Sequence, residues 1–234
     1  MRGVFVTGTG TGVGKSVVSA ALAASLVARG ERVVASKPLL SGLDDDYPVW
    51  PPDHELLARI TGEPADVIAP HRYGPAVSPH LAARWAGERH TAEALATEVR
   101  ARHHAAALGG HDPVLVVEGA GGLLVPLDDD GASMADLAFE LGLPVVVAAH
   151  PGLGTINHVQ LTLEAARARN LEVSGVVLTP WPEMPGDIER DNLAYLLTRS
   201  GARLRQLPVV AAPQPAALAS AGAAAGLADL VREA

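Results

Sequence analysis

The glycine-rich segment near the N-terminus constrains the fold most strongly. A short apolar run, Val4–Thr7, leads into a loop in which glycine occupies positions 8, 10, 12 and 14, and Lys15-Ser16 then open an apolar helical pattern. This order of strand, glycine loop, Lys-Ser and helix is typical of phosphate-binding loops, although this loop is one residue longer than the usual spacing. Backbone N–H groups and the helix N-terminus bind phosphate, while the lysine reaches the β and γ oxygens and the serine hydroxyl can ligate Mg²⁺. The loop therefore predicts a site for a nucleoside triphosphate.

The rest of the chain alternates short β-branched runs with longer helical patterns. Runs such as Val114–Val117 and Val145–Val147 are apolar throughout, which is typical of parallel strands buried on both faces. The alternation predicts an α/β fold with a doubly wound, mostly parallel sheet flanked by helices, of the P-loop NTPase type. The expected strands are Val4–Thr7, Arg32–Ser36, Pro113–Val117, Pro144–Ala149, Val173–Leu178 and Arg203–Pro208. The expected helices are Lys15–Ala28, Pro52–Thr61, Thr91–Leu108, Ser133–Leu141, Thr155–Arg169, Gly186–Ser200 and Ala216–Arg232.

The length of 234 residues is that of one domain, and we expect residues 1–234 to form a single α/β domain. Two stretches rich in proline, Asp44–Pro52 and Ala69–Pro79, are expected to be long loops. The alanine-rich segment 211–234 is expected to be a loosely packed helix or partly frayed, with no role in the chemistry.

Composition excludes several classes of function. The net charge is −8 and aromatic residues make up 3%, so the basic and stacking surfaces of nucleic-acid-binding proteins are not expected. Without cysteine, thiolate catalysis and disulfides are excluded. No apolar run reaches the roughly 18–20 residues of a membrane span, and the N-terminal residues do not resemble a signal peptide. We therefore expect a cytoplasmic protein that binds neither membranes nor nucleic acid.

Only two of the 18 basic residues are lysines, Lys15 and Lys37, and the others are arginines. Lys37 follows the second expected strand, so Lys37 and Ser41 should face the same crevice as Lys15, because the carboxyl ends of parallel strands line one edge of the sheet. Both positions favour a compact ammonium group over a guanidinium fork. Glu118 ends a buried strand and is a candidate for holding a metal ion or its water. Asp53 opens a helix, where an aspartate is equally well explained as a helix-capping residue.

With these residues in place, the chain resembles the dethiobiotin synthetase family from Val4 to about Pro208. The resemblance rests on the extended phosphate loop and on four further motifs: Lys37-Pro38 with Ser41-Gly42, Ser78-Pro79-His80, Glu118 to Gly122, and Leu153 to His158. It implies a homodimeric, ATP- and Mg²⁺-dependent ligase of biotin biosynthesis that builds the ureido ring of dethiobiotin from 7,8-diaminononanoate and CO₂. The route it implies passes through a carbamate and a mixed carbamic–phosphoric anhydride.

The resemblance also implies roles for individual residues. Lys15 and Lys37 would be catalytic, and Ser16, Asp53 and Glu118 would surround Mg²⁺. The substrate would contact Thr11, Lys37, Ser41 and Gly121, and its carboxylate would be held by Gly154, Thr155, Ile156 and Asn157 of a second subunit. The nucleotide would contact Gly12, Val13, Gly14, Lys15, Ser16, Val17, Thr179, Pro180, Pro208, Val209 and Val210.

One position departs from the family pattern. Where the family commonly has an asparagine that reads the adenine edge, this chain has Thr179, which cannot make the bidentate contact of a carboxamide. We therefore expect a weaker preference for ATP over other triphosphates.

Two other interpretations explain the sequence less well. A dimeric switch ATPase of the partition or septum-positioning type would share the fold, but such proteins carry an additional lysine early in the loop, where this chain has Gly10. The adjacent His103 and His104 suggest a metal site, but neighbours on a helix point to different faces, and we expect both to lie on a solvated surface.

Overall fold

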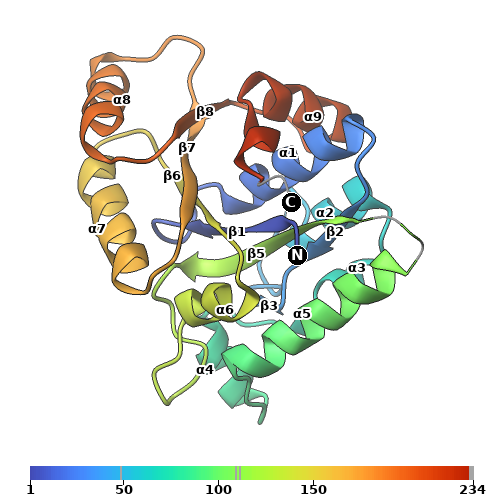
Figure 1. Cartoon of the computed structure of the whole chain (residues 1–234). Helices are drawn as coiled ribbons and strands as arrows, with labels where there is room; N and C mark the ends of the chain where they lie inside the picture. The colour runs from blue at the N-terminus through green and yellow to red at the C-terminus, as the bar shows by residue number, and fades with distance from the viewer. Residues whose placement is uncertain (48, 109, 111, 232–234) are drawn as a thin grey trace.

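A six-stranded parallel sheet forms the centre of the molecule. The computed structural model describes residues 1–47, 49–108, 110 and 112–231 (Figure 1). The order of the strands in the sheet is β2-β5-β1-β6-β7-β8, and each neighbouring pair is parallel. Its strands are β1 (Gly3–Gly8), β2 (Val33–Ser36), β5 (Val114–Gly122), β6 (Val145–Ala149), β7 (Val173–Trp181) and β8 (Leu204–Pro208). The doubly wound, parallel α/β fold expected from the sequence is confirmed.

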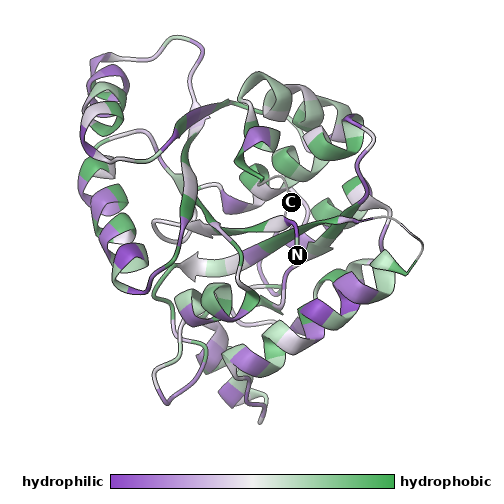
Figure 2. Ribbon diagram, viewed as in Figure 1, coloured by the Kyte–Doolittle hydropathy of each residue, from purple (hydrophilic) through white to green (hydrophobic). Residues whose placement is uncertain are grey.

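Helices cover both faces of this sheet. They are α1 (Lys15–Ala28), α2 (Asp53–Thr61), α3 (Ala65–Ile68), α4 (Pro79–Trp85), α5 (Ala92–Ala107), α6 (Met134–Leu141), α7 (Thr155–Ala168), α8 (Asp187–Arg199), α9 (Pro215–Ala224) and the 3₁₀ turn η1 (Leu227–Leu230). Successive strand residues face opposite sides: Val4 and Val6 join a core with α1, α2 and α9, whereas Phe5 joins a core with α5, α6 and α7. In Figure 2 the sheet-covering helices α1 and α9 are largely green, while α5 and α8 carry purple polar residues. Among the described residues, no helix has both the length and the hydropathy needed to cross a bilayer.

The expected elements all exist, with bounds shifted by one or two residues in most cases. The largest shift at a strand end concerns β5, which was expected to stop at Val117. It continues through Glu118 to Gly122, because Gly122 still pairs with Gly8 of β1. Glu118 therefore lies within a strand rather than after its end.

The expected loop Ala69–Pro79 is only partly a loop. His71–Arg72 forms β4, which pairs in parallel with β3 (Leu39–Leu40) to make a second, two-stranded sheet. Pro79 is the first residue of α4, where a proline fits because the first helical N–H needs no partner. This small sheet lies directly beside the segment that carries Lys37 and Ser41.

The alanine-rich C-terminal segment is tightly packed, so the expectation of a loose or frayed helix was wrong. Helix α9 lies against α1, and a β-carbon at Gly222 would lie 2.2 Å from the backbone oxygen of Ala21. Leu218 and Leu227 are fully buried. Small residues permit this close approach of two helix backbones, which apolar periodicity alone does not reveal. The helix ends at Ala224 and η1 follows; Arg232, the expected last helical residue, is outside the described residues.

Candidate active site

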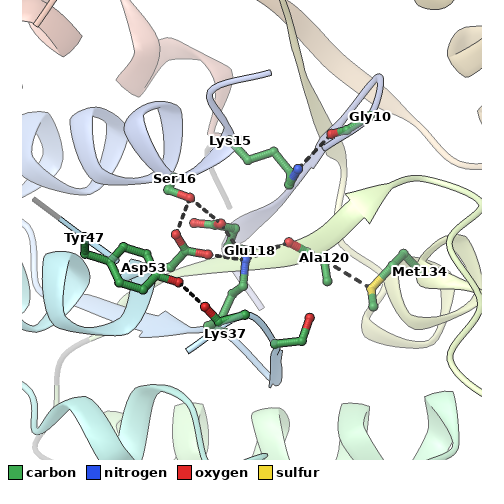
Figure 3. A network of polar contacts seen from close by, with 12 residues as sticks. Gly10, Lys15, Ser16, Lys37, Tyr47, Asp53, Glu118, Ala120 and Met134 are labelled. Atoms are coloured by element: carbon green, nitrogen blue, oxygen red, sulfur yellow. Dashed lines mark hydrogen bonds and ion pairs between the residues drawn. The ribbon is translucent and has the colours of Figure 1, made fainter. Parts of the chain in front are cut away.

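The phosphate-binding loop connects β1 to α1 at the carboxyl edge of the sheet. Gly14, the residue before α1, has a φ of 89°, which favours glycine. A β-carbon there would also lie 2.7 Å from the Thr179 methyl carbon. The ammonium of Lys15 bends back over the loop and donates a hydrogen bond to the Gly10 carbonyl at 2.9 Å (Figure 3). The loop, its helix and its lysine are thus arranged as the sequence predicts for phosphate binding.

Lys37 lies at the centre of a buried ion cluster. Its ammonium group is 2.6 Å from Glu118 Oε1 and 2.7 Å from Asp53 Oδ2, and it also donates to the Gly119 carbonyl at 3.1 Å (Figure 3). Residue Lys37 is 2% exposed and Glu118 is fully buried. Three neighbouring strands and one helix converge here, because Lys37 follows β2, Glu118 lies on β5, the loop follows β1 and Asp53 opens α2.

The three residues expected to surround a metal ion are in mutual contact. The Ser16 hydroxyl lies 2.6 Å from Asp53 Oδ1 and 3.0 Å from Glu118 Oε1. The other carboxylate oxygen of Glu118, Oε2, is buried and has no hydrogen-bond partner in the described part of the chain. Oxygen donors of this kind are the ligands that Mg²⁺ prefers. The donor set and the unpartnered buried oxygen therefore fit a bound magnesium ion.

The charges in this cluster shift one another's pKa. Burial works against ionisation of Asp53, but the charge and hydrogen bonds of Lys37 outweigh it and hold the pKa of Asp53 at about 2. Burial also works against the charged form of Lys37, yet the two carboxylates keep its pKa above the ordinary value. Burial raises the pKa of Glu118, with Lys37 opposing that effect. The pKa of Lys15 is lowered to about 8 by burial and by the charge of Lys37.

A cavity of about 590 Å³ opens over this cluster. The lining includes residues with predicted catalytic, metal-binding, substrate and nucleotide roles: Thr11, Gly12, Gly14, Lys15, Ser16, Val17, Lys37, Ser41, Asp53 and Gly121. Glu118, the third predicted metal ligand, is fully buried and is not in the lining. Ser41 is fixed at its rim by a hydrogen bond to the Val77 carbonyl of 2.6 Å. Lys37 and Ser41 do face the same cavity as Lys15, as the sequence predicts.

The predicted nucleotide residues at the ends of β7 and β8 are not in the lining of this cavity. The Thr179 methyl group packs over the phosphate loop at Gly14, and the residue itself is 2% exposed. The backbone N–H of Val209 donates to the Trp181 carbonyl at 3.2 Å, which holds the ends of β7 and β8 together. The same pair of strand ends includes Pro180, Pro208 and Val210. Val13, a predicted nucleotide residue of the phosphate loop, packs against the core beside α1.

The four residues expected to bind a carboxylate are separated from the cavity. Gly154 precedes α7 with a φ of 90°, and Thr155, Ile156 and Asn157 form its first turn. Asn192 of α8 fixes the preceding loop by donating to the carbonyls of Pro151 and Gly152. These residues are not in the lining of the cavity described above.

Sequence reasoning missed two aromatic residues of the site. Tyr47 and Trp50 line the cavity, and the Tyr47 hydroxyl donates to the Gly42 carbonyl at 2.8 Å. Both lie in the proline-rich stretch 44–52 that was expected only to be a long loop. Because the whole chain has eight aromatic residues, two of them three positions apart in one loop were a usable signal.

Comparison with known proteins identifies a family. The family described as "AAA domain" matches residues 2–214. The "ATP-dependent dethiobiotin synthetase BioD" of Saccharopolyspora erythraea is 41% identical over 231 residues, which cover 97% of each chain. The protein of the same name from Anaeromyxobacter sp. (strain Fw109-5) is 44% identical over 180 residues, 76% of each chain. That from Mycolicibacterium vanbaalenii is 37% identical over 234 residues, 99% of this chain and 93% of the relative.

A solved structure supports the fold alone. The chloroplast FtsY of Physcomitrella patens superposes with a TM-score of 0.50 over 95% of this chain and 65% of that one, at 15% sequence identity. Such a distant likeness is informative about the arrangement of strands and helices and not about activity.

Proposed function

The chain belongs to the AAA-domain family and to the family of ATP-dependent dethiobiotin synthetases, and we propose that the cavity over Lys15 and Lys37 is where it closes the ureido ring of dethiobiotin. The protein is an ATP-dependent ligase of biotin biosynthesis. The observation that carries the site assignment is the convergence on one cavity of the phosphate loop, two lysines and the oxygen donors of Ser16 and Asp53. The buried Glu118 contacts Lys37 and Ser16 beside that cavity.

The proposed reaction has three steps. One amine of 7,8-diaminononanoate adds to CO₂ and loses a proton, giving a carbamate. A carbamate oxygen then attacks the γ-phosphorus of ATP, and ADP leaves. The second amine attacks the carbonyl carbon of the resulting anhydride, so that the ring closes, phosphate leaves with the carbamate oxygen, and the amine's proton goes to solvent.

The residues of the cavity would bind and orient these groups. Phosphoryl transfer needs in-line positioning and positive charge on the phosphoryl oxygens rather than covalent participation of the protein. Lys15 and Lys37 supply two ammonium groups, while Thr11, Ser41 and Gly121 line the part of the cavity proposed for the carbamate. Ser16, Asp53 and Glu118 would hold Mg²⁺, which when bound neutralises phosphate charge.

The nucleotide is proposed to lie along the phosphate loop with its base towards the ends of β7 and β8. Gly12, Val13, Gly14, Lys15, Ser16 and Val17 would contact the phosphates, and Thr179, Pro180, Pro208, Val209 and Val210 would lie around the base. The Thr179 methyl packs on Gly14, so this side chain has no carboxamide to offer a base edge.

Base selectivity should therefore be low. We expect kcat/KM for ATP, CTP and GTP to agree within about tenfold, because no bidentate side-chain contact distinguishes the bases at position 179. Phosphate release measured with each nucleotide at saturating diamine and bicarbonate checks this. The variant Thr179→Asn is the matched control and should increase the preference for ATP; strict use of ATP by the unaltered protein would refute the expectation.

The active form is proposed to be a homodimer working in the cytoplasm, each chain forming one domain of residues 1–234. Gly154, Thr155, Ile156 and Asn157 open α7 away from the cavity of their own chain, so they would bind the diaminononanoate carboxylate in the cavity of the second subunit. Two features support this. The Thr155 hydroxyl is buried without a hydrogen-bond partner among the described residues, and Leu153 beside it is 94% exposed. A helix N-terminus also suits a carboxylate.

A shared site predicts rescue between two defective subunits. Lys37→Met removes the phosphate-side lysine of one cavity, and Asn157→Ala weakens the carboxylate site that belongs to the other. In a mixed dimer one of the two cavities keeps both native residues. When equal amounts of the two variants exchange subunits, about half of the dimers are mixed, so about a quarter of all cavities are intact. We therefore expect about a quarter of the unaltered activity at sub-saturating diamine. Activity no higher than the mean of the two separate variants would refute a shared site.

The proposed function is tested by following the carbon atom. Incubation with 7,8-diaminononanoate, Mg·ATP and ¹³C-bicarbonate should give dethiobiotin with one ¹³C atom, detected by mass spectrometry. Absence of labelled dethiobiotin from folded, nucleotide-binding protein would refute it.

A further inference from the structure

A second group of metal-ligating side chains lies outside the cavity, where β4 approaches α5. It comprises His71 on β4, Glu88 and His90 in the connection between α4 and α5, and Glu98 on α5. One ligand atom from each of His71, Glu88 and His90 lies within 4.8 Å of the others. Outside the predicted magnesium ligands, the sequence suggested a metal site only at His103 and His104. His103 is in fact buried and contacts the Pro113 carbonyl, so the expectation that both are solvated was wrong for His103.

The distances within this group are close to those of a four-coordinate ion. His90 Nε2 lies 3.5 Å from Glu88 Oε2, and His71 Nε2 lies 2.9 Å from Glu98 Oε2. The two imidazole rings are 4.3 Å apart between centroids. In a tetrahedral zinc site with ligand bonds of about 2.0–2.1 Å, neighbouring donor atoms are about 3.3 Å apart. Small adjustments of side chains would therefore direct the donors of His71, Glu88 and His90 at one point. Glu98 is outside that group of three but already contacts His71, so a movement of its exposed side chain would bring the fourth donor.

The surroundings have the features that support metal ligands. The Tyr73 hydroxyl donates to Glu88 Oε2 at 2.7 Å, which fixes the orientation of the carboxylate, and it lies 2.6 Å from His90 Nε2. Because its single proton goes to the carboxylate, the hydroxyl accepts from His90 Nε2–H in the metal-free protein, and this nitrogen loses its proton when it binds a metal. Tyr73 and His90 are buried, while the side chains of Glu88 and Glu98 are 52% and 50% exposed. The group thus has a rigid inner side and an open outer side through which an ion can enter.

We propose that His71, Glu88, His90 and Glu98 form a structural site for a transition-metal dication such as Zn²⁺, separate from the magnesium ligands of the active site. Imidazole nitrogens favour Zn²⁺ over Mg²⁺, and two carboxylates balance its charge. Four protein ligands leave no open coordination position, which is typical of structural rather than catalytic zinc.

The location gives such a site a consequence for the cavity. His71 pairs with Leu39 and Arg72 with Leu40, so β4 is joined to the strand that immediately precedes Ser41. An ion bound to both β4 and α5 would hold this small sheet in place beside the cavity.

The test uses the full chain, freed of metal with a chelator and titrated with Co²⁺ followed by visible absorption. We expect one equivalent to give the intense bands of tetrahedral Co²⁺, which an excess of Zn²⁺ removes. The double variant His71→Ala/His90→Ala should bind Co²⁺ at least 100-fold more weakly, and Glu98→Gln about tenfold more weakly. His104→Ala, an exposed histidine on α5 outside the group, and Asp53→Asn, in the active site, should both keep the bands.

Three results would overturn the proposal. They are the absence of intense bands in the unaltered protein, their persistence in the double variant, and their loss in His104→Ala or Asp53→Asn. Far-UV circular dichroism establishes that each variant is folded; should the double variant fail to fold, His71→Ala alone serves. Zn²⁺ should also raise the thermal midpoint of the unaltered protein and leave that of a folded cluster variant unchanged.

Discussion

Replacing Lys37 with methionine is expected to lower kcat by about 100- to 1,000-fold, because one preorganised cation at the reacting phosphate is removed. The ammonium of Lys37 is also the counter-charge of Glu118 and Asp53, at 2.6 and 2.7 Å. Its loss leaves a fully buried carboxylate unpaired, so we also expect unfolding free energy to fall by about 3–5 kcal/mol. Single-turnover kinetics and denaturant unfolding measure the two effects.

Three further variants separate the effect of charge from that of side-chain shape. Lys37→Arg keeps the charge but replaces a compact ammonium with a broad guanidinium, and we expect it to lower kcat about tenfold or more, as we expect for Lys15→Arg. The double variant Lys37→Met/Glu118→Gln should recover much of the stability lost in Lys37→Met, because the unpaired charge is gone, and none of the activity. Near-native turnover in either arginine variant would contradict the role proposed for that lysine.

Replacing Glu118 with glutamine is expected to raise the half-saturating Mg²⁺ concentration by about tenfold or more. Glu118 is fully buried, and its Oε2 has no hydrogen-bond partner in the described part of the chain. The amide removes one negative charge and one oxygen donor, and it brings N–H groups towards Lys37, so both the cation and the lysine lose a favourable contact. Titration of activity with Mg²⁺ and direct binding of Mn²⁺ measure the change.

Glu63→Gln is the matched control for the glutamate variant. Glu63 also accepts hydrogen bonds, from Arg102 at 3.0 Å and from the backbone N–H of Ala35 at 2.9 Å, but it is not in the lining of the cavity. Its Mg²⁺ dependence should match that of the unaltered protein. An unchanged Mg²⁺ requirement in Glu118→Gln would remove Glu118 from the proposed metal ligands.

The longer helices and strands could be predicted because each has its own pattern of apolar residues in the sequence. Helix α1 begins and ends at Lys15 and Ala28, as the sequence predicts, since the glycine loop fixes its start and a continuous apolar pattern its length. The short elements were not predictable in the same way. β3 and β4 have two residues each and form because Leu39–Leu40 meets His71–Arg72, a pairing that no local pattern records.

The site was predictable in its members and not in their contacts. The rarity of lysine pointed to Lys15 and Lys37, and both were expected at one edge of the sheet because each follows the carboxyl end of a predicted parallel strand. That Lys37 pairs with Asp53 and Glu118 could not be predicted, because the partner of a buried charge depends on side-chain packing between elements that are separate in sequence. Lys37 and Glu118 are 81 residues apart. The sequence likewise left Asp53 equally well explained as a helix-capping residue, whereas its carboxylate contacts Ser16 and Lys37.

The central claim is that this cavity couples phosphate release to ring closure, and dependence on the diamine tests it most directly. With Mg·ATP and bicarbonate present, phosphate release should be near background until 7,8-diaminononanoate is added, and should then equal dethiobiotin formation mole for mole. Lys37→Met should release little phosphate under either condition. Steady phosphate release without the diamine, unchanged by adding it, would contradict the claim and favour the switch ATPase alternative.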